Sequence, residues 1–164
     1  MIGYSGPEQA YISPNLKSAN LAPGIMTTGI AKDLSCGRIV DSTTDSPFIS
    51  SPLGFVPKPD NSLRRIHHLS FLIGTLVNDG IPIDAFHLHY TTITRIFALI
   101  VQAGRHSVII KRDIKDAFRN IPLAPHIRWL LGFSWDDKYY TEACLPFGLR
   151  TAPFIFNLFA EGFH

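Results

Sequence analysis

Two aromatic-rich runs late in the chain do most to limit the folds open to it. Trp129–Trp135 and Tyr139–Ala143 are each long enough for a strand, and the Asp136–Lys138 segment between them is turn-forming. This pattern predicts an antiparallel hairpin. After it, Thr151 can cap a helix that has Pro153 near its first turn. The apolar face of that predicted helix consists of Phe156, Phe159, Ala160 and Phe163.

A second hairpin is predicted earlier in the chain. Leu53–Val56 and Leu63–Ile66 are short apolar runs on either side of a turn at Asp60-Asn61. Lys58 and Arg64 flank this turn, six residues apart. Two cations placed in this way can both reach one triphosphate. Solvated surface cations are the alternative explanation.

The middle of the chain predicts one helix and one strand. Apolar residues spaced i, i+3, i+4, i+7 and i+8 predict an amphipathic helix, capped by Thr91 or Thr92 and ended by Gly104. The apolar residues concerned are Ile93, Ile96, Phe97, Ile100 and Val101. Ser107–Ile110 is typical of a buried strand, and it delivers the chain to Asp113.

Residues 1–46 have a different character. They are rich in Ser, Thr, Gly, Pro and Asn and show no sustained period of 2 or 3.6, so we expect a leader of loops, short irregular pieces and partial disorder. Residues 47–164 are expected to form the structured domain. Its mixture of hairpins and helices predicts an α+β fold in which an antiparallel sheet packs on helices.

Composition excludes several classes of protein. The 164 residues are 46% hydrophobic, which argues against disorder over the whole length. No apolar stretch approaches the ~18 residues that cross a bilayer, and the N-terminus does not resemble a secretory signal. We therefore expect an intracellular protein, in the nucleus or cytoplasm, without a membrane partner. Residues 51–164 carry twelve basic and nine acidic side chains, a mild excess that permits a phosphate-rich partner.

Asp113 is the first candidate for chemistry. A carboxylate at the end of a core strand is costly to bury alone, but it suits a hard divalent cation. Nucleotidyl transfer needs such carboxylates, because two Mg²⁺ ions bridge the attacking hydroxyl and the leaving phosphate. An ordinary Asp that caps the next turn is the alternative. A second candidate is the junction Leu145–Pro153, where Gly148 lets a backbone approach a flat ligand closely.

The order of these motifs resembles the reverse transcriptases of retrotransposons. The segment Ser51–Arg64 is similar to the fingers hairpin of that family, Asp113–Phe118 to its first palm motif, and Leu145–Pro153 to its second. The resemblance implies the partial fingers and palm of a right-hand polymerase. The DIRS type is the nearest in flavour. That likeness is carried by Ile66–Ser70, Val77–Pro82, Ala117–Arg119 and Leu130–Phe133.

The resemblance also implies roles for particular residues. Asp113 would bind both catalytic Mg²⁺ ions, with the Ile114 carbonyl as a further ligand. The ring of Phe118 would crowd a ribose 2′-OH and so favour deoxynucleotides. The triphosphate would contact Lys58, Arg64 and the backbone N–H groups of Asp116 and Ala117, while Phe147 and Gly148 would pack near nucleotide and template. The implied partners are a nucleic acid template-primer and a dNTP.

Two features limit the activity that we expect of this chain. The pair Asp136-Asp137 precedes the second palm motif, so we interpret it as a turn and not as the family's paired catalytic aspartates. The chain reaches His164 without an aromatic-x-Asp-Asp segment. We therefore expect a fragment that has no polymerase activity alone, binds Mg²⁺ weakly or not at all, and exposes apolar surface.

Competing hypotheses remain open at this point. One is a non-catalytic nucleic-acid-binding or interaction module derived from a reverse transcriptase. The other is an α/β domain unrelated to polymerases, which requires all three motif matches to be coincidental. Paired histidines at His67-His68, and at His87 and His89, lack Cys or Glu at a spacing that favours a metal site.

Overall fold

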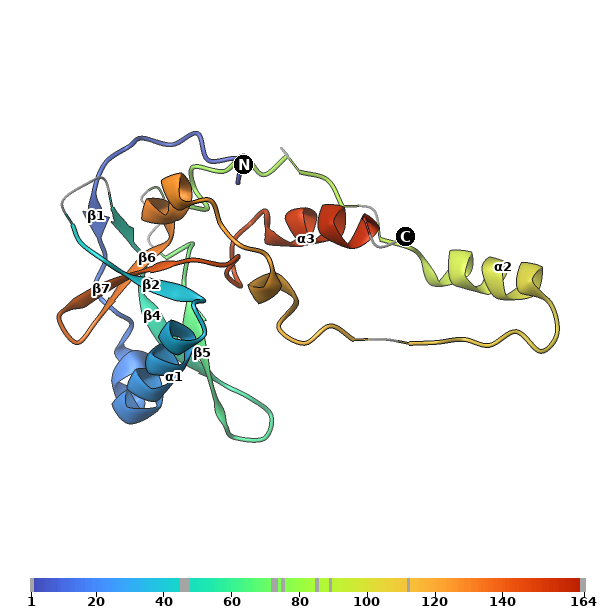
Figure 1. The fold of residues 1–164 in the computed structure, drawn as a ribbon, viewed down its shortest axis with the longest axis horizontal. Coiled ribbons are helices and arrows are strands. Elements are labelled where there is room, and N and C mark those ends of the chain that lie inside the picture. Colours follow the sequence, from blue (N-terminus) through green and yellow to red (C-terminus); the bar gives the residue numbers. More distant parts are fainter. Residues whose placement is uncertain are drawn as a thin grey trace.

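The computed structural model describes residues 2–44, 48–71, 74, 76–84, 86–88, 90–111 and 113–162. Its strands fall into two sheets (Figure 1). The larger sheet has the order β1-β3-β6-β7-β2, and the smaller is the hairpin β4-β5. The strands are β1 (Tyr11–Ile12), β2 (Ile39–Ser42), β3 (Ile49–Ser50), β4 (Leu53–Pro57), β5 (Leu63–His67), β6 (Gly132–Trp135) and β7 (Lys138–Glu142).

The larger sheet is mixed, which differs from the antiparallel sheet predicted. β6, β7 and β2 pair antiparallel, but β1 and β3 run parallel to β6. The parallel pairs involve β1 and β3, two-residue strands for which no strand was predicted. Both predicted hairpins are confirmed. Asp136 and Asp137 form the turn of the β6–β7 hairpin, both with positive φ, as in the tight turns that suit hairpins.

Helices and short 3₁₀ turns surround the sheets. The α-helices are α1 (Pro23–Ser35), α2 (Ile93–Ala103) and α3 (Ala152–Glu161), and the 3₁₀ segments are η1 (Lys17–Leu21), η2 (Ala117–Asn120) and η3 (Pro125–Leu131). The first part of the predicted strand Trp129–Trp135 is wrong, because the chain stays in η3 as far as Leu131. Pro125 at the start of η3 favours this helical turn.

The expectation of an irregular leader is wrong for α1. This helix begins at Pro23 and buries Met26 and Ile30. It ends in a Schellman motif: the N–H of Gly37, which has φ +66°, donates to the Leu34 carbonyl, and the N–H of Arg38 donates to the Asp33 carbonyl. β1 and β2 also belong to the sheet. The predicted boundary between residues 46 and 47 lies outside the described residues and stays a prediction.

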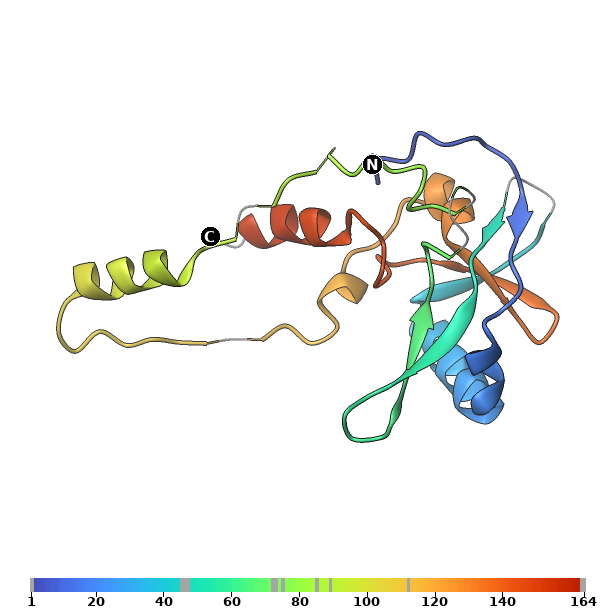
Figure 2. The same ribbon diagram turned by 180° about the vertical axis from the view of Figure 1, so that it is seen from behind.

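Two apolar cores hold the structure together. One is formed by Ala19, Met26, Ile30, Ile39, Leu53, Phe55, Phe133 and Tyr140. Figure 2 shows from behind how α1 lies beside the strands that contribute to it. The other includes Leu131, Leu145, Leu149 and Ala152 and packs the start of α3 against Ile2. The Thr151 hydroxyl donates to the Ile2 carbonyl at 3.0 Å. Thr151 stands at the predicted N-cap, but its side chain makes no cap hydrogen bond.

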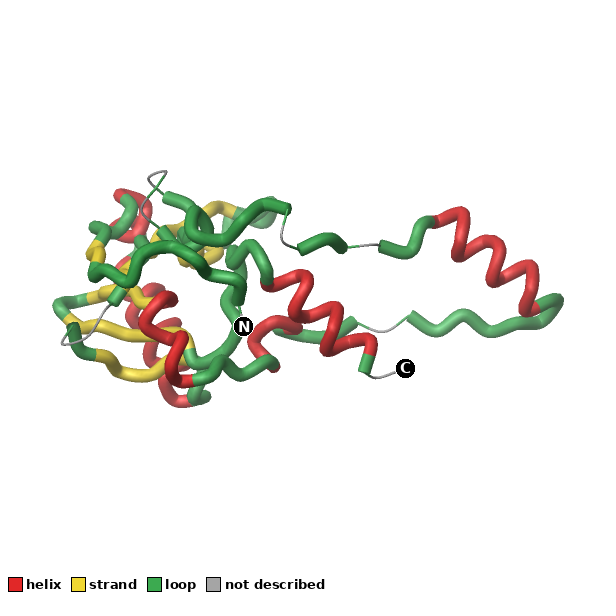
Figure 3. The backbone as a smooth tube through the Cα atoms, turned by 90° about the horizontal axis from the view of Figure 1, so that it is seen from above, coloured by secondary structure: helices red, strands yellow, loops and turns green. Residues whose placement is uncertain are grey.

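α2 stands apart from both cores, at the end of an arm formed by two irregular segments (Figure 3). The predicted helix and its ends are confirmed, with the Thr92 hydroxyl accepting from the Arg95 N–H and Gly104 at the C-cap. Its apolar side chains are exposed, Phe97 at 63% and Val101 at 81%. Phe163, predicted for the apolar face of α3, lies outside the described residues.

The predicted buried strand Ser107–Ile110 is wrong. These residues have no regular structure, and Val108 is 84% exposed. β-branched residues favour strands mainly by packing against neighbouring strands. Among the described strands none pairs with this segment, so local preference alone does not make it a strand.

Candidate nucleotide-binding site

Three aromatic side chains from separate elements meet beside the second palm motif. The ring centroids of Phe118, in η2, and Phe147 lie 5.1 Å apart at an interplanar angle of 47°. Phe156 of α3 contacts Phe118 edge-on at 5.7 Å. These spacings are those of favourable aromatic pairs. Because Phe147 remains 56% exposed, the cluster presents an open aromatic surface of the kind on which a base or sugar can pack.

The bend at Gly148 is built around a buried amide. Gly148 has φ +90°, and a Cβ there would lie 3.3 Å from the His67 carbonyl oxygen, so both its conformation and its surroundings favour glycine. The Asn78 amide nitrogen donates to the Gly148 carbonyl at 2.8 Å, and the Asn78 oxygen accepts from the Arg150 N–H at 2.8 Å. Asn78 also donates to the Ser70 hydroxyl. In the sequence, Asn78 belongs to one of the segments that carry the DIRS resemblance, and no role was predicted for it.

The β4–β5 hairpin carries the two predicted phosphate-binding cations near its tip. The Lys58 N–H donates to the Ser62 carbonyl at 2.8 Å, which closes the turn. Asn61 takes the left-handed conformation there, with φ +62°. Lys58 and Arg64 are both exposed. The Asp60 carboxylate accepts from the side chain and the backbone N–H of Ser62, and these bonds lower its pKa.

Asp113 lies on the irregular segment that returns from α2. It is exposed, and the neighbouring Ile114 side chain is 52% exposed. The structure brings Phe118 and Phe147 together beside Gly148, but within its described part no contact joins Asp113 to this cluster. The predicted convergence of all three groups on one cleft is therefore supported for the aromatic side only.

The residues present do not by themselves fit a two-magnesium centre. Asp113 and the Ile114 carbonyl are oxygen donors of the type that Mg²⁺ prefers, yet two ions need several carboxylates. Over the described residues, no three His, Cys, Asp or Glu side chains gather as in a metal site. The nearby Asp116 is engaged elsewhere, with its Oδ2 atom 2.9 Å from Arg38 Nη2.

A largely buried ionic network lies behind the site, and sequence reasoning missed it. Arg119, which follows Phe118, donates to Glu142 of β7 at 2.5 Å and lies 3.6 Å from Asp33 of α1. Asp33 also pairs with Arg65 of β5. His67 lies 3.3 Å from Glu142, and its other ring nitrogen lies 3.1 Å from the Gly132 carbonyl oxygen. The network therefore joins the fingers hairpin, α1, η2 and β7.

Electrostatics stabilise the buried carboxylate at the centre of this network. Burial alone would raise the pKa of Glu142, but the hydrogen bond with His67 and the charge of Arg119 hold that pKa below its ordinary value. The hydrogen bond to Asp116 in turn raises the pKa of Arg38. Charges buried in this way are tolerated only when they are paired, so these side chains constrain how the elements pack.

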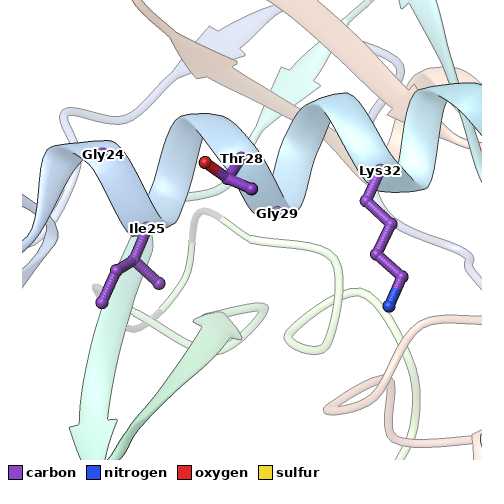
Figure 4. Close-up of a pocket in the computed structure, with 5 residues that line it drawn as sticks. All are labelled: Gly24, Ile25, Thr28, Gly29 and Lys32. Carbon is purple, nitrogen blue, oxygen red and sulfur yellow. The ribbon is translucent and has the colours of Figure 1, made fainter.

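A shallow depression along α1 is a separate feature (Figure 4). It is lined by Gly24, Ile25, Thr28, Gly29 and Lys32. None of the predicted site residues lines it. Gly29 leaves room for Arg65, whose Nη1 atom would lie 3.1 Å from a Cβ at that position.

A family model described as reverse transcriptase (RNA-dependent DNA polymerase) matches residues 56–164, which is more than half of the chain. The chain belongs to the reverse transcriptase family. No helix among the described residues has both the length and the apolar character needed to cross a membrane.

Several of the similar proteins are foamy viral. The Pro-Pol polyprotein of simian foamy virus type 1 is 28% identical over 109 residues, 66% of this chain, and the chain spans only 9% of that relative. The native protease-reverse transcriptase of prototype foamy virus has a TM-score of 0.63 at 23% identity, over 98% of this chain and 19% of that one. A foamy viral protease-reverse transcriptase in complex with an RNA/DNA hybrid has a TM-score of 0.66 at 18% identity, over 97% and 19% of the two chains. The predicted partial fingers-and-palm fold is confirmed by these neighbours.

Proposed function

We propose that this chain forms the nucleotide-contacting part of an RNA-directed DNA polymerase from a mobile element, with a DIRS-like retrotransposon as its origin. The observation that carries the proposal is the Phe118–Phe147 pair beside the bend at Gly148. Two adjacent rings beside a glycine turn offer a flat apolar surface to a sugar and a base. The neighbours solved with double-stranded DNA and with an RNA/DNA hybrid support a nucleic acid partner.

Under this proposal each site residue has a defined task. Phe118 excludes a 2′-OH, and Phe147 packs against the nucleotide and template. Lys58 and Arg64, exposed on a short hairpin, supply positive charge to the triphosphate. The backbone of Asp116 and Ala117 lines the same nucleotide.

We further propose that the 164-residue chain alone does not polymerise. Asp113 would supply one carboxylate toward magnesium, with the Ile114 carbonyl beside it, and the exposed position of both favours weak or no Mg²⁺ binding by this chain. A primer-extension assay on an RNA template with Mg²⁺ and dNTPs tests the point directly. Measurable synthesis by this chain would overturn the proposal.

Nucleic acid binding is tested separately from catalysis. Fluorescence anisotropy with a labelled RNA/DNA hybrid should show saturable binding that weakens with salt, as expected for contacts to phosphates. Lys58→Ala with Arg64→Ala should weaken binding of a labelled dNTP in the presence of the hybrid. Lys17→Ala with Lys32→Ala removes the same charge from exposed residues that are not part of the hairpin and is the matched control.

The exposed position of Asp113 also favours a second candidate, a non-catalytic nucleic-acid-binding or interaction module derived from a reverse transcriptase. Hybrid binding without any dependence on dNTP would favour this candidate. Sequencing the DNA next to the region that encodes this chain also distinguishes the two candidate functions. An in-frame aromatic-x-Asp-Asp segment supports the polymerase, and a neighbouring recombinase supports the DIRS-like origin.

A further inference from the structure

Arg38 is held by its backbone at the meeting point of helix and sheet. Its N–H donates to the Asp33 carbonyl at 2.9 Å at the end of α1. Its carbonyl accepts from the N–H groups of Ala143 at 2.8 Å and Cys144 at 3.3 Å. The residue is therefore anchored on both sides, and its side chain projects from a rigid base.

The Arg38 side chain reaches the loop that begins the proposed nucleotide site. Its Nη2 atom donates to the Asp116 carboxylate at 2.9 Å. Asp116 has φ +52° and ψ +40°, a left-handed conformation that Asp tolerates better than most residues. It stands at the N-cap of η2, where its carbonyl accepts from the Arg119 N–H at 2.8 Å. The orientation of Phe118 follows from this turn.

We propose that Arg38 is a positioning residue, which holds Asp116 at the start of η2 and so fixes Ala117 and Phe118 against the Phe147 ring. The functional importance of this inference rests on the proposed function, since the loop that Arg38 holds is the proposed nucleotide-contacting loop. It assigns a task at the site to the first 46 residues, which lie outside the segment matched by the family model.

The same arginine relates the loop to the fingers hairpin. Arg38 Nη1 lies 3.7 Å from Asp33, and Asp33 pairs with Arg65 of β5. Arg65 is the strand neighbour of Arg64 and points to the opposite side of the hairpin, because successive residues of a strand alternate. The Asp33 carboxylate thus pairs with the middle of the hairpin and also lies beside Arg38, the side chain that binds Asp116.

Burial decides which measurement suits the test. The side chains of Arg38 and Asp116 are 28% and 38% exposed, so their ion pair adds little to global stability. A positioning role should therefore appear in the local opening of η2 and not in the melting of the whole chain. Amide hydrogen exchange of Arg119 and Ile121, whose N–H groups bond within this turn, reports that opening, and the amides of β6 and β7 report global unfolding.

The experiment is a double-mutant cycle on the nucleotide-free chain. Arg38→Ala should speed exchange at Arg119 and Ile121 by about threefold to tenfold. Asp116→Asn, which keeps a residue that tolerates the left-handed turn, should do the same. The double variant should be no faster than either single variant, because the two side chains act together. Lys32→Ala, an exposed cation of α1, should change nothing.

The proposal is overturned if Arg38→Ala leaves both amides unchanged, or if the two effects multiply in the double variant. If Arg38→Ala also exposes the amides of β6 and β7, Arg38→Lys decides. Retained protection at Arg119 in that variant supports the role of the charge, and lost protection refutes it. No nucleotide is present, so absence of dNTP binding by the parent chain would sink the proposed function and leave this inference standing.

Discussion

The amide nitrogen of Asn78 donates to the carbonyl oxygen of Gly148 across 2.8 Å, although 70 residues separate them in the sequence. Asn78 is 4% exposed, and the same side chain accepts from the Arg150 N–H. A buried amide thus holds both sides of the bend that follows Phe147. The shape of the proposed nucleotide surface depends on a residue that does not lie on that surface.

Replacing Asn78 should therefore disturb the bend. Asn78→Ala leaves the Gly148 carbonyl and the Arg150 N–H unpaired, and we expect a loss of about 1–3 kcal/mol in the free energy of unfolding. Urea denaturation measures the loss. Ser70→Ala removes only one of the Asn78 hydrogen bonds, at an exposed residue, and should cost clearly less. Equal effects of the two variants would contradict the assigned role.

Glycine at position 132 is predicted to be irreplaceable on steric grounds. A Cβ there would lie 2.8 Å from the Ile49 carbonyl oxygen, at the parallel contact between β3 and β6. Gly132→Ala should destabilise the chain by about 1–3 kcal/mol, as measured by thermal or urea unfolding. Gly24→Ala, in α1 with open space around it, is the control and should be neutral or mildly stabilising. If Gly132→Ala left the unfolding free energy unchanged, the sheet would have to accommodate the added methyl group by a small local shift.

Acid should weaken the fold through Glu142. Because its pKa is lowered in the folded chain, its ionised form stabilises the fold at pH values above the ordinary Glu pKa of about 4.3. That contribution is lost as the pH falls through the folded pKa. Glu142→Gln should cost about 3–5 kcal/mol at pH 7, since it leaves the buried Arg119 with only its longer 3.6 Å contact to Asp33.

The pH profile separates this effect from a simple packing defect. Unfolding free energies measured from pH 7 to pH 3 should fall less steeply for Glu142→Gln than for the parent chain. Glu161→Gln, at the exposed end of α3, should keep the parent profile. A parallel shift of the Glu142→Gln curve at every pH would rule out the linkage.

The arm that carries α2 should promote self-association. Phe97 and Val101 are 63% and 81% exposed, and exposed apolar groups in a patch favour aggregation. Phe97→Lys should raise solubility and lower binding of a hydrophobic dye. Its unfolding free energy should stay within about 0.5 kcal/mol of the parent value. Leu69→Lys, at a buried site, is the comparison. If Phe97→Lys lowered the unfolding free energy as much as Leu69→Lys does, α2 would have to pack on the core.

The sequence pattern predicted the two hairpins and α2, whose formation depends on residues close together in the chain. Both hairpins have turn residues flanked by apolar runs, and α2 has its cap at Thr92 and its end at Gly104. α1 was missed because Gly24, Thr27, Thr28 and Gly29 are poor helix formers. Pro23 near its start and Gly37 after its end were the available signals. Burial of Met26 and Ile30 supplies the stability that propensity lacks.

The sequence indicated the aromatic residues that the structure brings together, but it did not indicate the ionic network. Phe118, Phe147 and Gly148 belong to motifs, so their residue types could be recognised. Asp33, Arg119 and Glu142 look like ordinary surface charges in the sequence, and only the tertiary fold shows that they meet. Ser107–Ile110 failed for the opposite reason. Its residues favour a strand, but a strand needs a neighbour to pair with.

The hydrogen bond from Thr151 to the Ile2 carbonyl has a consequence for how the chain is made. The two partners are 149 positions apart, so the whole stretch between them must be synthesised before they can meet. Closing so long a loop is entropically costly, and contacts of this kind slow folding. Ile2 thus reaches its final place only after Thr151 has left the ribosome.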